Sequence, residues 1–237
     1  MTNRTLKIDA NKLKEKFNLK NCLILNDWEA IAYSYPSLKS DNLINLINPK
    51  TNFYNNNVLF FGPGTGLGVS LLIDDKYVQS TEVGNINLGV NELVGDELAS
   101  TNKFSKIEDT ISGTGISKIY ELKKDKKISS EEIYKLAKNG EDFALEIIED
   151  LIDRIAILLS QLTLTYMPGK GIFLAGSMMR SLINFIDKKK FEKQFLANIE
   201  SPQLEILKMT PINIVTKENL AIYGCLNYFN SIQKDLN

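Results

Sequence analysis

Short apolar runs bounded by polar and turn-forming residues recur along the chain, and their length predicts buried strands. Residues 58–61 and 69–73 form the clearest pair, because both are short, almost wholly apolar and rich in β-type side chains. The same criteria predict further strands at residues 5–8, 22–25, 77–80, 171–175 and 212–215.

Apolar residues spaced three and four positions apart predict helices between these strands. The longest helix is expected over residues 141–166, where one apolar stripe leaves Asp153 and Arg154 outside it. The stripe consists of Leu145, Ile148, Ile152, Ile155, Leu159 and Leu162. Other helices are expected over residues 10–17, 28–35, 91–100, 116–122, 178–186 and 218–232, with a short one after Ser129. Residues 37–57 are polar and rich in Asn, so we expect a surface excursion there.

The stretch between the two clearest strands has glycine at every second position, from Gly62 through Gly64 and Gly66 to Gly68. Glycine allows positive φ and lets another group approach the main chain closely, so several N–H groups can face one anion. Thr65 adds a hydroxyl donor. We therefore predict a phosphate-binding loop. A glycine-rich hairpin without a ligand is the weaker alternative, because four glycines destabilise a plain hairpin.

The spacing excludes two common phosphate-binding loops. The Walker loop needs a Lys followed by Ser or Thr and a helix, and no Lys follows these glycines. The dinucleotide fingerprint needs glycine at offsets 0, 2 and 5 before a helix, but the last offset falls on Leu67 or Val69 and a strand follows. What remains is a glycine turn between two strands.

Composition restricts the chemistry further. The 237 residues include no histidine, so Ser-His-Asp catalysis, His-ligated zinc and His acid–base steps are excluded, and a carboxylate is the leading candidate for a general base. The net charge of −1 gives no indication of a nucleic-acid partner. The sequence contains no run of eighteen apolar residues, so we predict no membrane partner either. We expect no signal peptide. Cys22 and Cys225 lie in apolar segments and are predicted to be buried free thiols in a reducing compartment.

Polar residues follow two of the predicted strands, where open α/β sheets bind ligands. Asn26 and Asp27 follow residues 22–25, although Asp27 could instead cap the next helix. Glu82 and Asn85 lie in a polar loop, and they have the donors and acceptors that a sugar needs. An ordinary solvated turn is the alternative for that loop.

Two further glycine turns precede predicted helices. Glu108 lies just before a Ser-Gly-Thr-Gly turn that contains Gly113, and a helix N-terminus with two glycines can hold an anion or a hydroxyl-rich ligand. Gly176 follows the predicted strand at residues 171–175 and precedes a helix. This order of strand, glycine and helix is the usual position of the sugar or base of a nucleotide.

Together these stretches resemble the bacterial glucokinase family, which has the α/β, actin-like ATPase (ribonuclease H-like) fold of sugar kinases. Residues 25–27 resemble the family's catalytic Asn-Asp after a strand, and residues 62–68 resemble its second phosphate loop. Residues 81–85 resemble its sugar loop, and residues 175–176 its adenosine turn. Glu108 with the following Ser-Gly resembles its later sugar-binding Glu and turn. The resemblance runs over almost the whole chain.

The resemblance implies a cytoplasmic kinase that uses ATP to convert glucose to glucose 6-phosphate. Asp27 would accept the proton of the sugar's 6-hydroxyl as that oxygen attacks the γ-phosphate. The sugar would be bound by Asn26, Glu82, Asn85 and Glu108. The nucleotide would be bound by Gly62, Gly64, Thr65, Gly66, Gly113 and Gly176. Mg²⁺ would arrive with the nucleotide, without a set of protein ligands of its own.

The chain departs from the family's pattern in two respects. Asn85 replaces a histidine of the sugar loop and Thr81 replaces a glycine, so a kinase for another hexose is one alternative. The family opens with a strand and an Asp-Gly-Gly-Thr-Asn phosphate turn that have no counterpart here, so we expect impaired phosphoryl transfer. A catalytically inactive sugar- or nucleotide-binding remnant or regulator is the other alternative.

The second departure also sets the expected domains. Residues 37–215 would form a nearly complete large lobe. Residues 1–36 would be the remnant of a small lobe truncated at its N-terminal side, with the helix at residues 216–237 packing on it. An exposed strand edge in that remnant would favour association, here as a homodimer.

Overall fold

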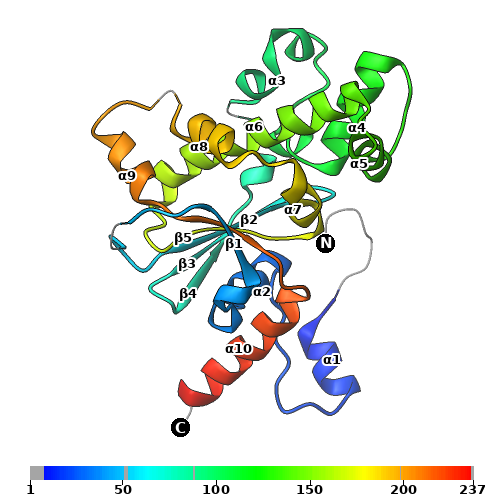
Figure 1. Cartoon of the computed structure of the whole chain (residues 1–237). Helices are drawn as coiled ribbons and strands as arrows, with labels where there is room; N and C mark the ends of the chain where they lie inside the picture. Colours follow the sequence, from blue (N-terminus) through cyan, green and yellow to red (C-terminus); the bar gives the residue numbers. More distant parts are fainter. Residues whose placement is uncertain (1–7, 51–52, 88, 198, 236–237) are drawn as a thin grey trace.

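The computed structural model describes residues 8–50, 53–87, 89–197 and 199–235. Within them, a six-stranded mixed sheet lies between two layers of helices (Figure 1). The strands are β1 (Leu43–Ile47), β2 (Val58–Pro63), β3 (Leu67–Ile73), β4 (Tyr77–Ser80), β5 (Gly171–Leu174) and β6 (Ile212–Val215). Their order across the sheet is β1-β6-β5-β2-β3-β4. β5 pairs in parallel with β2 and β6, whereas β1, β3 and β4 join the sheet antiparallel.

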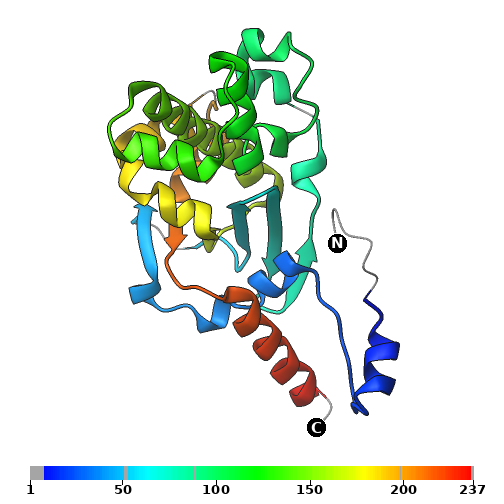
Figure 2. The ribbon, with the colours of Figure 1, turned by 90° about the vertical axis from the view of Figure 1, so that its right-hand side faces the viewer.

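The larger helical layer covers one face of the sheet and contains α3 to α9, while α2 and α10 cover the other face (Figures 1 and 2). α1 lies outside both layers. The helices are α1 (Ala10–Lys16), α2 (Asp27–Ala32), α3 (Val90–Ala99), α4 (Gly113–Lys124), α5 (Ser130–Lys138), α6 (Asp142–Tyr166), α7 (Ser177–Leu182), α8 (Lys188–Leu196), α9 (Gln203–Met209) and α10 (Leu220–Asp235). None of the helices in the described ranges has the length and hydrophobicity needed to cross a membrane.

Side chains on the two faces of β2 enter two separate hydrophobic cores. Leu59 and Phe61 join the larger core beneath α6, whereas Val58 and Phe60 join the smaller core that faces α2. This alternation is the period of two that a strand imposes, and all four side chains are fully buried. The apolar run that predicts this strand therefore marks the centre of the sheet.

α6 is the longest helix, and its apolar stripe lies in the larger core as predicted. Ile148, Ile155 and Leu159 on this stripe are buried. The prediction that Arg154 lies outside the buried face is wrong, because only 5% of this residue is exposed. Its guanidinium is accommodated by hydrogen bonds to backbone carbonyl groups, which are described with the site below.

α10 packs closely on α2 through a glycine. A Cβ on Gly224 would lie 1.6 Å from the carbonyl oxygen of Ala30, so a larger residue would separate the two helices. The side-chain amide of Asn227 donates a 2.9 Å hydrogen bond to the carbonyl oxygen of Tyr33. The small residue Gly224 therefore permits the close packing of α10 on α2. The division of the chain into two lobes stays a prediction.

Residues 22–25 do not form the predicted strand. They have no strand partner in the described part of the chain, and Leu23 and Ile24 are 58% and 52% exposed. An apolar run becomes a strand only where a neighbour satisfies its backbone groups, and none does so here. Cys22 is half-buried and Cys225 is exposed, so the prediction of two buried thiols is also wrong. The strand predicted at residues 5–8 lies almost entirely outside the described residues.

Residues 37–57 contain an edge strand that the sequence pattern does not predict. β1 pairs antiparallel with β6, and its residues Leu46 and Ile47 are buried. The side-chain amide of Asn45 donates a hydrogen bond to the side-chain oxygen of Asn213 on the neighbouring strand. A polar residue in the middle of β1 is therefore satisfied by its cross-strand partner.

Candidate active site

α2 begins at Asp27, and Asn26 caps it. The side-chain oxygen of Asn26 accepts hydrogen bonds from the backbone N–H groups of Trp28 at 2.9 Å and Glu29 at 3.2 Å. The alternative that Asp27 caps this helix is therefore wrong. Asp27 is exposed, and its Oδ1 accepts a 2.9 Å hydrogen bond from the backbone N–H of Trp28. Within the described ranges its Oδ2 has no hydrogen-bond partner, so this oxygen is available to a substrate proton.

The indole of Trp28 holds the start of α2 against the glycine hairpin of β2 and β3. A Cβ on Gly68 would lie 1.6 Å from the indole Nε1, and a Cβ on Gly62 would lie 2.2 Å from the ring carbon Cη2. Ser70 Oγ also donates a 2.8 Å hydrogen bond to the Trp28 carbonyl oxygen. Gly62 and Gly68 therefore make room for the tryptophan, and this packing brings Asp27 to the base of the hairpin.

The other two glycines of the hairpin have different surroundings. A Cβ on Gly66 would lie 2.4 Å from Oε2 of Glu108, whereas a Cβ on Gly64 would meet nothing within 4 Å. None of the four glycines adopts positive φ, so this loop does not use the left-handed backbone that glycine allows. Close approach explains Gly62, Gly66 and Gly68, and only Gly64 faces open space.

Glu108 joins the predicted sugar-binding elements to the glycine hairpin. Its Oε2 accepts a 3.2 Å hydrogen bond from the backbone N–H of Leu67, and its Oε1 forms an ion pair with Lys106. The residue lies in a 3-10 turn, Ile107–Asp109, far from the hairpin in the sequence. This contact therefore fixes the position of one predicted sugar ligand relative to the predicted phosphate loop.

A chain of polar contacts connects three of the predicted sugar-binding residues through a lysine. Asn85 Nδ2 donates a 2.8 Å hydrogen bond to Glu82 Oε2, and Lys106 Nζ donates a 3.1 Å hydrogen bond to Asn85 Oδ1. Lys106 also pairs with Glu108, and this hydrogen bond raises the pKa of Lys106 above its ordinary value. Lys106 is not among the site residues predicted from the sequence. The signal available for it was its position two residues before Glu108.

The N-terminus of α4 is attached directly to the tip of the hairpin. The backbone N–H of Gly113 donates a 2.8 Å hydrogen bond to the carbonyl oxygen of Gly64, and Thr114 Oγ1 donates one of 2.6 Å to that of Thr65. Ser112 caps this helix by accepting a 3.0 Å hydrogen bond from the backbone N–H of Gly115. Three of the residues predicted to bind nucleotide, Gly64, Thr65 and Gly113, are thereby brought together.

A cavity of about 450 Å³ lies beside these three residues, and hydroxyl-bearing side chains dominate its lining. Its walls come from the hairpin, α4, α5 and α7. The lining residues are Gly64, Thr65, Gly113, Thr114, Ser117, Ser129, Ser130, Glu131, Tyr134, Ser177, Met178 and Ser181. These hydroxyl groups suit a ligand with phosphate and hydroxyl groups, whereas the backbone N–H groups of Gly64 and Gly113 already donate to the carbonyl oxygens of Gly66 and Gly64.

Gly176 precedes α7 at the edge of this cavity. Its φ of 103° and ψ of 165° place it in a region that is essentially open only to glycine. Its neighbour Ser177 lines the cavity, whereas Gly176, Gly62 and Gly66 are not among the lining residues. The five glycines and Thr65 predicted to bind nucleotide therefore separate into residues at the cavity and residues that support its walls.

The donor set at the cavity fits a metal ion that is carried by a nucleotide. Glu131 is the sole carboxylate among the lining residues, and no group of three His, Cys, Asp or Glu in the described ranges could hold a metal ion. A Mg²⁺ ion there would take most of its ligands from phosphate oxygens and water.

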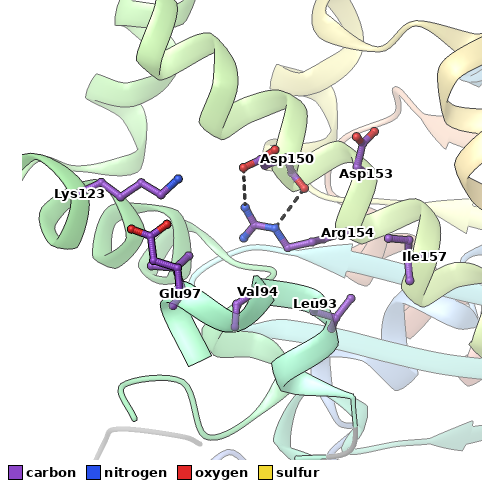
Figure 3. A pocket seen from close by; sticks show the side chains of 10 residues that line it. Leu93, Val94, Glu97, Lys123, Asp150, Asp153, Arg154 and Ile157 are labelled. Atoms are coloured by element: carbon purple, nitrogen blue, oxygen red, sulfur yellow. Dashed lines mark hydrogen bonds and ion pairs between the residues drawn. The ribbon is translucent and has the colours of Figure 1, made fainter. Parts of the chain in front are cut away.

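A second, smaller cavity of about 250 Å³ lies between α3, α4 and α6 (Figure 3). Arg154 forms part of its wall. The guanidinium donates 3.1 Å hydrogen bonds to the carbonyl oxygens of Asp150 and Thr110. Burial lowers the pKa of Arg154, and Asp150 opposes that shift. Because Thr110 lies between Glu108 and Ser112, α6 supports the loop that connects the two halves of the site.

Comparisons with known proteins agree with this arrangement. A family model described as Glucokinase matches residues 1–232. The glucokinase of Saccharophagus degradans is 27% identical over 251 residues, which cover 98% of this chain and 76% of that protein.

Two solved structures share the fold. A glucokinase from an Antarctic psychrotroph aligns with a TM-score of 0.82 and 22% identity, over 94% of this chain and 73% of that one. A ROK family glucokinase from Streptomyces griseus, in complex with glucose and AMPPNP, aligns with a TM-score of 0.62 and 16% identity. That alignment covers 91% of this chain and 70% of the other. The predicted actin-like sugar kinase fold is thus confirmed.

Proposed function

The chain belongs to the glucokinase family of hexose kinases, and on that premise we propose that it transfers the γ-phosphoryl group of ATP to the 6-hydroxyl of glucose. One observation carries the proposal. Glu108 binds the backbone of the glycine hairpin at Leu67 and also pairs with Lys106, which hydrogen-bonds Asn85 of the sugar loop. A sugar bound by this carboxylate would therefore lie beside the loop that faces the phosphates.

Asp27 is the proposed general base. Its position against the hairpin is fixed through Trp28, and the backbone N–H of Trp28 occupies only Oδ1. Oδ2 would accept the proton of the 6-hydroxyl as that oxygen attacks the γ-phosphate. Asn26 uses its side-chain oxygen as a helix cap, so its amide nitrogen would donate to a sugar hydroxyl.

The remaining sugar contacts would come from Glu82, Asn85, Lys106 and Glu108. In the ligand-free arrangement these four residues bind one another, and sugar hydroxyls would replace part of that network. Asn85 has its oxygen bound to Lys106 and its nitrogen bound to Glu82. Asn85 stands where the family has a histidine, so a hexose other than glucose is the alternative substrate.

Gly64, Thr65 and Gly113 would bind phosphate, with Gly62, Gly66 and Gly176 shaping the walls around them. Mg²⁺ bound to the nucleotide would neutralise charge on the transferring phosphoryl group. We place the enzyme in the cytoplasm, where ATP and reduced thiols occur together. Homodimer formation and impaired turnover stay predictions. Sedimentation velocity tests the first, and comparison of kcat with that of the Saccharophagus degradans relative tests the second.

The decisive experiment measures glucose 6-phosphate formation by the purified chain with glucose and MgATP. Asp27→Asn should lower kcat at least about 100-fold, because it removes the base and leaves the geometry of the site intact. The matched control is Asp41→Asn, which changes an exposed aspartate just before β1 and should leave kcat unchanged. A wild-type rate in Asp27→Asn would refute the assigned base. A folded chain without turnover would favour the binding-only alternative.

A further inference from the structure

We propose that the hydroxyl group of Tyr134 hydrogen-bonds the nucleoside part of ATP, and so makes Tyr134 a specificity-determining residue. The inference rests on the proposed function, because it takes the cavity beside Gly64 and Gly113 as the nucleotide site.

Tyr134 lies one helical turn beyond the phosphate end of the cavity. Ser130, at the start of α5, has its Oγ 2.9 Å from the position of a Cβ on Gly113, so α5 begins against the proposed phosphate-binding residues. Tyr134 follows Ser130 by four residues and therefore occupies the same face of α5, roughly 6 Å along the helix axis. In a bound ATP molecule, the nucleoside would extend from the phosphates along α5 towards Tyr134.

The hydroxyl of Tyr134 is buried without a partner in the described part of the chain. A buried polar group that makes no hydrogen bond destabilises a protein, and native structures contain few of them. Burial raises the pKa of Tyr134, so the hydroxyl stays protonated and can donate as well as accept. Asp153 Oδ1 is the other such atom recorded in the described ranges, and Asp153 does not line this cavity.

The surroundings of Tyr134 suit a nucleoside. Met178 of α7 lines the same cavity, and its thioether and the Tyr134 ring supply apolar surface suited to a flat base. Ser129 and Ser181 supply hydroxyl groups for the edges of such a ligand. A bound nucleoside would give the Tyr134 hydroxyl the partner that the free protein lacks.

The test compares binding of ATP with binding of inorganic tripolyphosphate, which lacks the nucleoside, by calorimetry on the full chain with Mg²⁺ present. Tyr134→Phe should weaken ATP binding about fivefold, which is the effect of one neutral hydrogen bond. Its affinity for tripolyphosphate should not change. The same variant should melt about 2–4 °C higher than wild type, because it removes an unsatisfied buried hydroxyl.

Tyr54→Phe is the matched control. The Tyr54 hydroxyl lies 3.3 Å from Thr210 Oγ1, away from the cavity, so its removal should lower the melting temperature and leave ATP affinity unchanged. Equal ATP affinity in wild type and Tyr134→Phe would overturn the proposal. An equal loss of affinity for tripolyphosphate would also overturn it, because the hydroxyl would then contact phosphate. So would a lower melting temperature, because the hydroxyl would then stabilise the fold.

The outcome is separable from that of the proposed kinase function. If Tyr134→Phe weakens ATP binding but the wild type forms no glucose 6-phosphate, the nucleoside contact stands and the kinase assignment fails. If Asp27→Asn abolishes turnover but Tyr134→Phe binds ATP normally, the kinase assignment stands and the nucleoside contact fails. A wild type that binds no ATP would refute both.

Discussion

Glycines at alternate positions of the β2–β3 hairpin serve two purposes. Gly68 and Gly62 lie against the Trp28 indole, and Gly66 lies against the Glu108 carboxylate. A Cβ on Gly64 would meet nothing within 4 Å, and Gly64 lines the cavity. The regular spacing therefore combines structural requirements at three positions with a ligand-facing position at the fourth, and single substitutions can separate the two.

Gly68→Ala should destabilise the protein by about 2–3 kcal/mol, since its methyl group would overlap the Trp28 ring and force it to move. Urea unfolding, followed at equilibrium, measures the change in the free energy of unfolding. The matched control is Gly64→Ala, which should leave that free energy within about 0.5 kcal/mol of wild type and weaken binding of MgATP. Equal destabilisation by both variants would contradict the assignment of Gly68 to Trp28 packing.

Lys106→Met should raise the KM for glucose about tenfold and leave the KM for ATP unchanged. The reason is that Lys106 orients Glu108 and Asn85, and charge-assisted hydrogen bonds hold both. A coupled assay with either substrate varied separates the two constants. Lys103→Met removes an exposed charge nearby and is the control, while Lys106→Arg should restore part of the glucose affinity. An equal rise in both KM values would assign Lys106 to the fold.

At the scale of elements, the apolar pattern predicts the central structure well. β2, β3, β5 and β6 are predicted within a few residues, and so is α6, because each buries a long apolar run or stripe. The alternating glycines also mark the turn between β2 and β3, as predicted. In these segments, local sequence and tertiary packing favour the same structure.

The failures occur where the partner of a segment decides its structure. β1 is surrounded by asparagines, and only its pairing with β6 shows that Leu46 and Ile47 are buried. Residues 22–25 have the composition of a strand, but no neighbouring strand pairs with them in the described ranges. The Arg154 guanidinium donates to the carbonyl oxygen of Thr110, and Lys106 donates to Asn85, which lies 21 residues away. These two contacts leave no local pattern in the sequence.

Arg154→Met should destabilise the protein by about 2–3 kcal/mol and raise the KM for glucose. The variant leaves the Thr110 carbonyl without its donor and the Asp150 carboxylate without its cation (Figure 3). Urea unfolding gives the first value and steady-state kinetics the second. Thr110 lies between Glu108 and Ser112, so the loss of its hydrogen bond to Arg154 should affect sugar binding more than it affects the core around β2.

Two variants separate positioning by Arg154 from general loss of stability. Arg180→Met removes an arginine from a surface ion pair with Glu218 at 3.6 Å, so it should cost less than about 1 kcal/mol and leave the KM for glucose unchanged. Arg154→Lys keeps the charge and should recover part of the glucose affinity. A large KM effect from Arg180→Met, or none from Arg154→Met, would show that α6 does not position the loop.

For the whole molecule, the glycine hairpin is the support on which the site is assembled. Trp28 attaches α2 and Asp27 to its base, Leu67 holds Glu108, and Gly64 holds the start of α4. The sheet beneath it is anchored in both cores through β2. Ligand binding should therefore affect the segments that contact the hairpin, and it should leave the other segments unchanged.

Hydrogen exchange can test this division of the molecule. In Asp27→Asn with glucose and MgATP, amides of residues 64–67, 106–115 and α5 should exchange more slowly than in the free protein, because a ligand would cover or order them. α1 contains no buried residue and lies outside both helical layers, so its amides should exchange rapidly with or without ligands. β2 should exchange slowly in both states, since all its residues are buried. Glucose alone is the control and should protect residues 106–115 more than α5. Protection of α1 by ligands, or none at the hairpin, would mean that the molecule does not transmit binding through the hairpin as the contacts predict.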